Sequence, residues 1–157
     1  ADFLELSFEE EGAGQGGYGK TMSPEFIAAE MALFKAQAQQ VDIIVTTALI
    51  PGKPAPKLIT TEMVQSMRPG SVIVDLAAEQ GGNCELTEPG EDVVRKGVTI
   101  VGNTNLPSTV PVHASRLYAR NVQALLTHLA PEGELTLDWD DEITAGACVT
   151  RSEEVPA

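Results

Sequence analysis

Short apolar, β-branched runs alternate with amphipathic stretches along the middle of this 157-residue chain. Two of these runs, 41–47 and 71–77, are each followed by a polar loop rich in Gly or Pro, and residues 60–67 between them carry one compact helical pattern. This order is typical of a βαβ unit, and in open parallel sheets small ligands bind at the carboxyl ends of the strands. We therefore expect a candidate site on the loops 46–56 and 79–84.

Further elements are predicted on both sides of this unit, so the predicted fold class is α/β. Ser23-Pro24-Glu25 is a strong helix start, because Ser caps the helix, Pro suits the first turn and Glu faces the positive end of the dipole. We expect this helix to run to about Gln40, and a longer one at His113–Leu129. The other expected elements are strands at Phe3–Phe8, Val98–Val101 and in two runs within Glu134–Thr150, and loops at Glu9–Thr21 and Asn103–Pro111.

The loop after the first strand carries groups that suit a ligand site. Thr46 and Thr47 place hydroxyls and backbone amides at the strand end. Pro51 stiffens the middle of the loop, and Gly52 allows the backbone to approach a ligand closely. Lys53 either meets a phosphate or carboxylate of a ligand or is an ordinary solvent-exposed lysine.

The loop after the second strand begins with a carboxylate and ends in a glycine turn. Asp75 has a structural interpretation, the capping of nearby amides, beside its interpretation as a cleft residue. Glu79 and Gln80 point toward the cleft if the strand ends near Ala77. The Gly81-Gly82 turn then closes this second wall of the predicted site.

The charge balance narrows the partners that the chain can bind directly. Ten Lys and Arg against 23 Asp and Glu give a formal net charge of −13. Such a surface repels nucleic acid and anionic membranes, so we expect neither as a direct partner. No apolar run approaches the ~20 residues of a membrane span, which predicts no direct membrane insertion. Cys84 and Cys148 lack metal or redox spacing, and we favour two buried, reduced thiols over a disulfide between them.

Residues 12–17 match the pattern G-x-G-x-x-G, but their context argues against a dinucleotide fingerprint. In a true fingerprint the last glycine opens a helix directly, so that amides meet the pyrophosphate. Here the helix begins only at Ser23, and the carboxylates of residues 9–11 stand at the mouth. The segment is therefore expected to be a flexible flap, with Tyr18 able to stack on a ligand.

Three long stretches carry a family resemblance. Residues 3–31, 46–60 (TTALIPGKPAPKLIT) and 72–91 (VIVDLAAEQGGNCELTEPGE) resemble the NAD(H)-binding domain of proton-translocating nicotinamide nucleotide transhydrogenases, a family related to alanine dehydrogenase. The likeness extends over essentially the whole chain and includes the closing GACVTR.

The resemblance implies a Rossmann-like domain that binds NAD(H) and passes hydride to NADP(H) on a separate domain. A membrane domain of the same complex would couple the exchange to proton movement, and the NAD-binding domain would form a homodimer. Residues 9–23 resemble the mobile loop whose tyrosine closes over the nucleotide. The implied cofactor-binding residues are Tyr18, Thr46, Thr47, Ala48, Leu49, Pro51, Lys53, Asp75, Leu76, Glu79, Gln80, Gly81, Gly82 and Asn83.

The chain departs from the family where the family's fingerprint glycines and its acidic ribose-binding residue would stand, upstream of residue 1. We therefore expect only the downstream half of a doubly wound parallel sheet in residues 1–109. Residues 110–157 are expected to form a returning helix and strands that belong to a second, N-terminal domain. The fragment alone is expected to be inactive, and the complex to lie on the cytoplasmic face of the cell membrane, attached through partner subunits.

Three functions remain open, and we favour transhydrogenase. Hydride transfer between two nicotinamides needs positioning and no general base, so no catalytic residue is predicted. An alanine dehydrogenase needs an acid/base group, and its family carries an aspartate where this chain has Glu79. The third possibility is a catalytically silent Rossmann remnant that acts as an interaction piece.

Overall fold

The computed structural model describes residues 2–6, 22–50 and 52–150. The chain divides into two compact units, Ala1–Leu106 and Pro107–Ala157, and each is described by itself. The glycine motif 12–17, Tyr18 and Pro51 lie outside the described residues. The predicted domain boundary between residues 109 and 110 lies close to the division between the two units.

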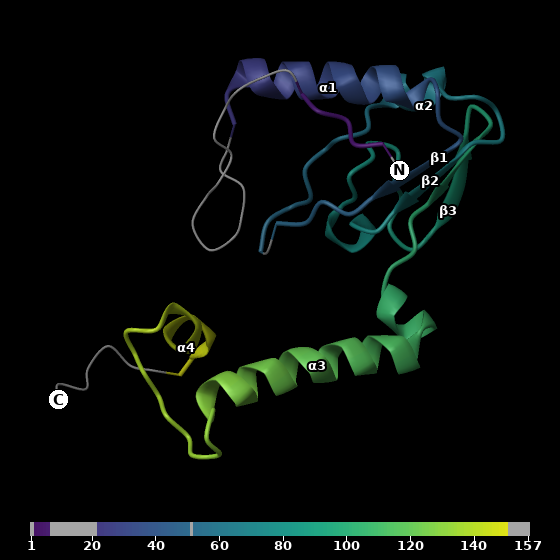
Figure 1. The fold of residues 1–157 in the computed structure, drawn as a ribbon. Coiled ribbons are helices and arrows are strands. Elements are labelled where there is room, and N and C mark those ends of the chain that lie inside the picture. Colours follow the sequence, from purple (N-terminus) through teal and green to yellow (C-terminus); the bar gives the residue numbers. More distant parts are fainter. Residues whose placement is uncertain (1, 7–21, 51, 151–157) are drawn as a thin grey trace. The chain divides into compact units, whose positions relative to one another are not determined.

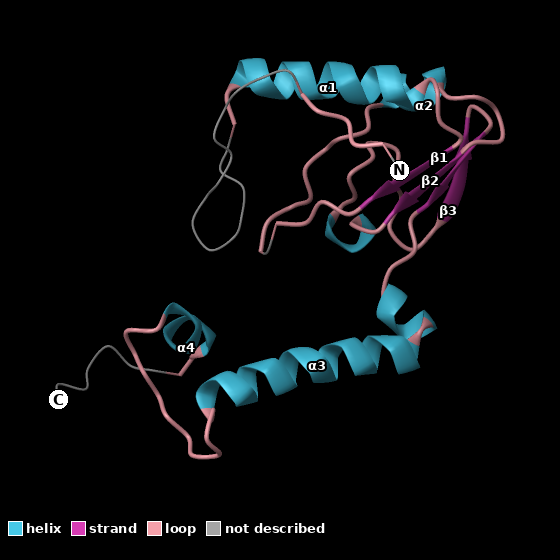
Figure 2. Cartoon of the chain, viewed as in Figure 1, coloured by secondary structure: helices cyan, strands magenta, loops and turns pink. Residues whose placement is uncertain are grey.

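The first unit is built on a four-stranded sheet in the order β1-β2-β4-β3 (Figures 1 and 2). Strand β1 (Ile43–Thr46) pairs in parallel with β2 (Val72–Asp75), which pairs in parallel with β4 (Val98–Val101). The register places Thr46 beside Asp75, so both strands end at the same level. The α/β class and the three predicted strands are confirmed, although each of the first two is shorter than expected.

Strand β3 (Asp92–Arg95) was not predicted. It pairs antiparallel with β4 and forms the edge of the sheet. The connection is the two-residue turn Lys96-Gly97, in which both residues have positive φ, 54° and 81°. Such a turn matches the right-handed twist of the two strands that it joins in a hairpin.

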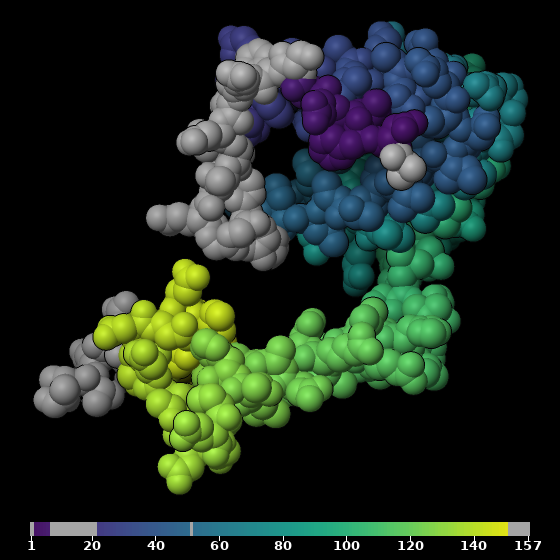
Figure 3. Space-filling view, in the orientation of Figure 1, coloured from purple at the N-terminus to yellow at the C-terminus, as the bar shows by residue number. Residues whose placement is uncertain are grey.

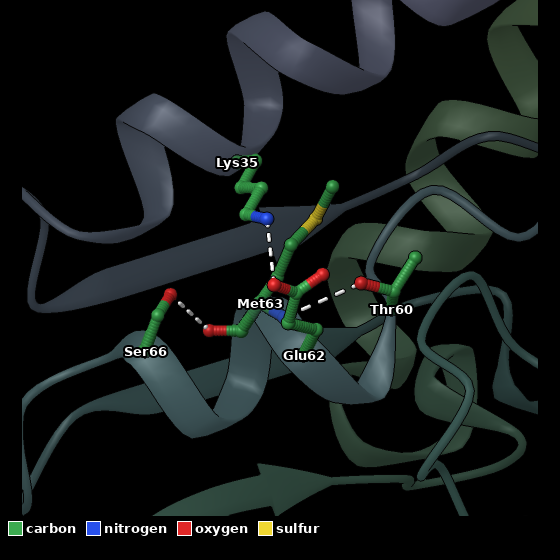
Figure 4. A network of polar contacts seen from close by, with 5 residues as sticks. All are labelled: Lys35, Thr60, Glu62, Met63 and Ser66. Carbon is green, nitrogen blue, oxygen red and sulfur yellow. Dashed lines mark hydrogen bonds and ion pairs between the residues drawn. The ribbon is translucent and has the colours of Figure 1, made fainter.

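Two helices of the first unit each begin directly after a capping residue. Helix α1 (Pro24–Ala38) starts after Ser23, whose side chain accepts the Phe26 amide hydrogen. Helix α2 (Thr61–Ser66) starts after Thr60, whose hydroxyl accepts the Met63 amide hydrogen at 3.3 Å. Figure 4 shows Lys35 reaching from α1 to Glu62 of α2, at 2.6 Å.

These helices cover one face of the sheet. The core cluster contains Ala38 of α1, side chains of α2 and alternate residues of the inner strands; its fully buried members include Val64, Ile73, Cys84, Val98 and Ile100. Because strand side chains alternate, the opposite face carries the neighbouring positions. That face is apolar and open within the first unit, since Ile43, Val45 and Val94 are 65%, 57% and 61% exposed.

The second unit is helical. A 3-10 turn, η3 (Leu106–Thr109), precedes α3 (Pro111–Leu129), and α4 (Glu142–Ala147) follows. The predicted strands within Glu134–Thr150 are wrong, because none of the described residues of this segment pairs with a strand. Helix α4 occupies part of the segment in which a strand was expected.

Asp141 explains why α4 forms. Its carboxylate accepts the Thr144 amide hydrogen at 2.7 Å and lies 2.8 Å from Nε2 of His128 on α3. Together the His128 and Thr144 hydrogen bonds hold the pKa of Asp141 well below its usual range. A capping aspartate therefore outweighs the strand-like composition of this segment.

The predicted strand at Phe3–Phe8 is also not found for the residues that the structure describes there. Residues 3–6 have no regular secondary structure. They lie on the surface of the first unit (Figure 3). Together with residues of α1 they line a groove of about 420 Å³.

Candidate functional site

The two loops predicted to form a site meet beyond the carboxyl ends of β1 and β2. The Ala55 amide donates to the Gln80 carbonyl at 2.9 Å, and Ile59 forms a parallel bridge with Cys84. The amides of Leu58 and Ile59 both donate to the Asn83 carbonyl. These backbone bonds join segments that lie more than twenty positions apart in the sequence.

Asp75 holds this junction together. It is 1% exposed, and its carboxylate accepts hydrogen bonds from the hydroxyls of Thr46 and Thr87 and the amides of Ala77 and Cys84, at 2.6–3.2 Å. Burial acts to raise the pKa of Asp75, but the hydrogen bonds that its carboxylate accepts, foremost those from Cys84 and Thr87, together outweigh burial and keep that pKa below its usual value. The structure thus supports the capping interpretation of Asp75.

Asn83 ties the first loop to the second. Its side-chain oxygen accepts the Ala48 amide hydrogen at 3.0 Å, and its side-chain nitrogen donates to the carbonyls of Ala48 and Pro56 at 2.9 and 2.8 Å. Asn83 is fully buried. All of its side-chain atoms that can bond are therefore engaged with the backbone of the first loop.

The Gly81-Gly82 turn has two independent reasons to be glycine at its second position. Both residues have positive φ, 92° and 78°. A Cβ on Gly82 would lie 2.5 Å from Oδ2 of Asp75 and 2.8 Å from Cβ of Thr87. The turn can therefore close over Asp75 only because no side chain stands there.

Lys57 was not among the predicted site residues. Its ammonium donates to the carbonyls of Gly81, Gly82 and Cys84, at 2.6, 2.9 and 3.4 Å. In the sequence it resembles any other lysine of a Pro-rich loop. Its partners are backbone atoms more than twenty residues away, so no local pattern could have identified it.

The predicted residues separate into two groups. Thr46, Asp75, Gly82 and Asn83 are buried and hold the loops; Thr47, Leu49, Lys53, Leu76, Glu79, Gln80 and Gly81 are exposed, and Ala48 is half-buried between them. Two of the exposed residues, Lys53 and Gln80, line an open pocket of about 480 Å³ together with Gly52 and Pro54. Among the described residues, none bonds the ammonium of Lys53.

A separate apolar cavity of about 320 Å³ lies between α1 and the end of β1. Phe34, Val41 and Leu58 contribute to its lining, and residues 46–48 form one side. The carboxyl end of β1 therefore borders a cavity with a largely apolar lining.

Both cysteines are free, as predicted. Cys84 is buried beside Asp75, and burial raises the pKa of its thiol. Cys148 is only half-buried, so the expectation that both thiols are buried holds for Cys84 alone.

Comparison with known proteins identifies the family. A family model described as the alanine dehydrogenase/PNT, C-terminal domain matches residues 5–156. The chain belongs to this family. The predicted resemblance and the Rossmann-like fold class are therefore confirmed, and domains of the alanine dehydrogenase/PNT family bind NAD(H), the predicted cofactor.

Relatives within the family differ in how similar they are to this chain. The NAD(P) transhydrogenase subunit alpha of Haemophilus influenzae is 51% identical over 99% of the chain and 31% of its own length. A crystal structure of transhydrogenase from Sinorhizobium meliloti matches with a TM-score of 0.58 and 48% identity, over 64% of this chain and 30% of that one. An L-alanine dehydrogenase structure matches with a TM-score of 0.55 and 32% identity, over 66% and 30%.

This alanine dehydrogenase/PNT domain spans about a third of the length of the curated relatives it matches. Within the residues that the structure describes, no helix is both long and apolar enough to cross a bilayer.

Proposed function

We propose that this chain forms one wall of the NAD(H) site in an NAD(P) transhydrogenase alpha subunit. The observation that carries the proposal is 51% identity to such a subunit over nearly the whole chain, against 32% to an alanine dehydrogenase of solved structure. The meeting of two polar loops at the carboxyl edge of a parallel sheet supports it, because nucleotides bind at this edge in Rossmann-like folds.

The exposed residues fit part of a dinucleotide. Lys53 offers a phosphate an ammonium that no other described residue bonds, and Gln80 beside it offers amide donors and acceptors. Gly81 and Gly52 leave the backbone open to close approach. Thr47, Leu49, Leu76 and Glu79 complete the proposed contact set, and Tyr18 and Pro51 belong to it on sequence grounds.

Bound NAD(H) supplies the hydride, so the residues of this chain need only bind and orient it. Transfer between two nicotinamides releases no proton from an alcohol or amine, and a general base is unnecessary. The buried group around Asp75 provides rigidity, since its hydrogen bonds fix both loops before the nucleotide arrives. Preorganisation of this kind lowers the cost of binding.

The proposed partners are an NADP(H)-binding domain that accepts the hydride and a membrane domain that couples the exchange to proton translocation. The complex would lie on the cytoplasmic face of the membrane, with the NAD-binding domain as a homodimer. The amphipathic face of α3 would pack on another domain of the natural protein, which accounts for its exposed apolar residues here.

A titration of NADH into the natural protein that contains this chain tests the proposal through nicotinamide fluorescence. We expect saturable binding, weakened about tenfold by Lys53→Met through loss of a charge-assisted contact. Lys35→Met is the matched control, because it removes one exposed charge from α1 and should leave binding unchanged.

The same preparation separates the competing functions. We expect NADH to reduce an NADP⁺ analogue, and no alanine-dependent reduction of NAD⁺. The reverse result would favour an alanine dehydrogenase, in which Glu79 takes the acid/base position. Absence of NADH binding by the unmodified protein would overturn the proposal and favour a silent interaction piece.

A further inference from the structure

The chain holds a lysine whose bonding pattern is unusual for an exposed side chain. Among the described residues, Lys57 bonds no carboxylate; it donates to three backbone carbonyls, those of Gly81, Gly82 and Cys84. An ammonium has three hydrogens and no acceptor, so these three bonds use all of its donors. We propose that Lys57 is a positioning residue of the nucleotide site, acting through the 79–84 loop and never touching the nucleotide.

The loop lies between two opposite charges. The ammonium of Lys57 donates to the carbonyls of Gly81, Gly82 and Cys84, whereas the buried carboxylate of Asp75 accepts the Cys84 amide hydrogen. Cys84 therefore has its carbonyl oxygen on the cation and its amide hydrogen on the anion. Hydrogen bonds to charged partners are stronger than hydrogen bonds between neutral groups, so the loop is held firmly from both sides.

This arrangement fixes the loop from its solvent side. Asp75 is buried beneath the turn, but Gly81 is exposed, and both glycines have backbone conformations that no side chain restrains. Without Lys57 the outward carbonyls of Gly81 and Gly82 would bond only to water. The loop would then keep its hydrogen bond to the buried Asp75 and lose its hydrogen bonds to Lys57 on the solvent side.

Positioning of the loop reaches the proposed nucleotide contacts directly. Gln80 immediately precedes the clamped turn, accepts the Ala55 amide hydrogen with its carbonyl, and lines the pocket that contains Lys53. Displacement of the turn would move Gln80 relative to Lys53. The two lysines thus have different tasks: Lys53 is available to a ligand, and Lys57 is committed to the backbone.

Three variants test the inference, which rests on the proposed function for its binding readout. Lys57→Met keeps the length of the side chain and removes its donors; Lys57→Arg keeps charge and donors; Lys35→Met removes a charge elsewhere on the surface. The variants should fold, because Gly81 is exposed to water, the Cys84 carbonyl keeps the Thr87 amide as a donor, and the bonds of Asp75 are unchanged. NADH affinity is measured in the natural protein, together with hydrogen exchange of the Gly81 and Gly82 amides.

In Lys57→Met we expect NADH binding to weaken about tenfold, as for other lost charge-assisted bonds. Exchange of the Gly81 and Gly82 amides, which donate to the carbonyls of Ala78 and Ala77, should accelerate. Lys57→Arg should restore both values to within about twofold of the unmodified protein. Exchange at the Val64 amide in α2 should be the same in all proteins.

The outcomes distinguish this inference from the proposed function. Unchanged amide exchange in Lys57→Met would show that Lys57 does not fix the 79–84 loop, whether or not NADH binds. Faster exchange with unchanged NADH affinity would overturn the positioning role. Failure of the unmodified protein to bind NADH would overturn the proposed function and with it the role in nucleotide binding.

Discussion

Asp75 carries a negative charge at the point where the two strand-end loops meet, and its side chain is almost completely removed from water. A buried carboxylate is costly unless several donors compensate it. Here the hydroxyls of Thr46 and Thr87 and the amides of Ala77 and Cys84 do so. The charge therefore stabilises one loop arrangement and disfavours any other that would leave the carboxylate unpaired.

We expect Asp75→Asn to lower the free energy of unfolding of the natural protein by about 2–4 kcal/mol at pH 7. The asparagine NH₂ group replaces one carboxylate oxygen, so a hydrogen-bond donor would face a backbone amide that itself donates. Urea denaturation measures the difference. Thr99→Ser, a change of similar size on a neighbouring strand, is the control and should cost much less.

The difference in free energy of unfolding between the unmodified protein and Asp75→Asn should vary with pH, because folding shifts the pKa of Asp75. Because hydrogen bonding lowers the pKa of Asp75 in the folded protein, its stabilisation is fully present above the unfolded carboxyl value of about 3.9. It is lost as the pH falls through the lower folded value. The gap between the two proteins should narrow only in strongly acidic solution; a gap that stays constant down to acid unfolding would contradict the assignment.

At the scale of elements, the correct predictions came from signals that lie within the element itself. Ser23-Pro24 marks the start of α1, and Thr60 caps α2. Strand β3 escaped because Asp92–Arg95 is short and half polar, and only pairing with β4 makes it a strand. Helix α4 was mistaken for strand because its capping residue, Asp141, is equally typical of a turn between strands.

In the candidate site, too, only the features that depend on local sequence could be predicted. The loops after β1 and β2 were predictable, because carboxyl ends of parallel strands adjoin. Which of their residues face outward was not, since it depends on contacts between distant segments: Asn83 is buried by its bonds to Ala48, and Lys57 is fixed by the carbonyls of Gly81 and Gly82. Tertiary contact, more than residue type, separates the anchoring residues from the exposed ones.

Helix α2 offers a prediction at this scale. Its first turn has two acceptors: the Thr60 hydroxyl for the Met63 amide, and the Glu85 carboxylate for the Thr61 amide at 2.7 Å. Loss of an N-cap costs about 1 kcal/mol, so Thr60→Ala should lower the free energy of unfolding by this amount. Thermal or urea unfolding measures it.

Thr60→Ser serves as the control for this helix, because serine keeps the hydroxyl that caps it. It should unfold almost as the unmodified protein does. If Thr60→Ala is as stable as Thr60→Ser, the Glu85 carboxylate alone is sufficient to cap α2. The Lys35–Glu62 pair in Figure 4 should contribute little, since both side chains are exposed.

At the scale of the whole molecule, the two units share one property: each leaves an apolar surface open. In the first unit it is the face of the sheet that carries Ile43, Val45 and Val94. In the second it is the stripe of α3 formed by Tyr118, Val122 and Leu126, which recur every four residues and so share one side of the helix. Contiguous apolar surfaces of this kind mark places where another part of a protein docks. Relatives of three times the length contain the additional chain that such docking requires.

A substitution in the apolar stripe of α3 tests whether another domain covers this surface in the natural protein. Leu126 is 60% exposed in this chain, and if it stays exposed in the natural protein, Leu126→Glu should change the free energy of unfolding by no more than about 0.5 kcal/mol. If another domain covers the stripe, the same change buries a carboxylate without a partner and should cost about 3 kcal/mol or more. We expect the larger value. Thr127→Glu, on the polar side of α3, adds the same charge and should have almost no effect; urea denaturation of the natural protein measures both. A small effect for Leu126→Glu would mean that α3 presents its apolar side to solvent or to a partner that leaves the protein before unfolding.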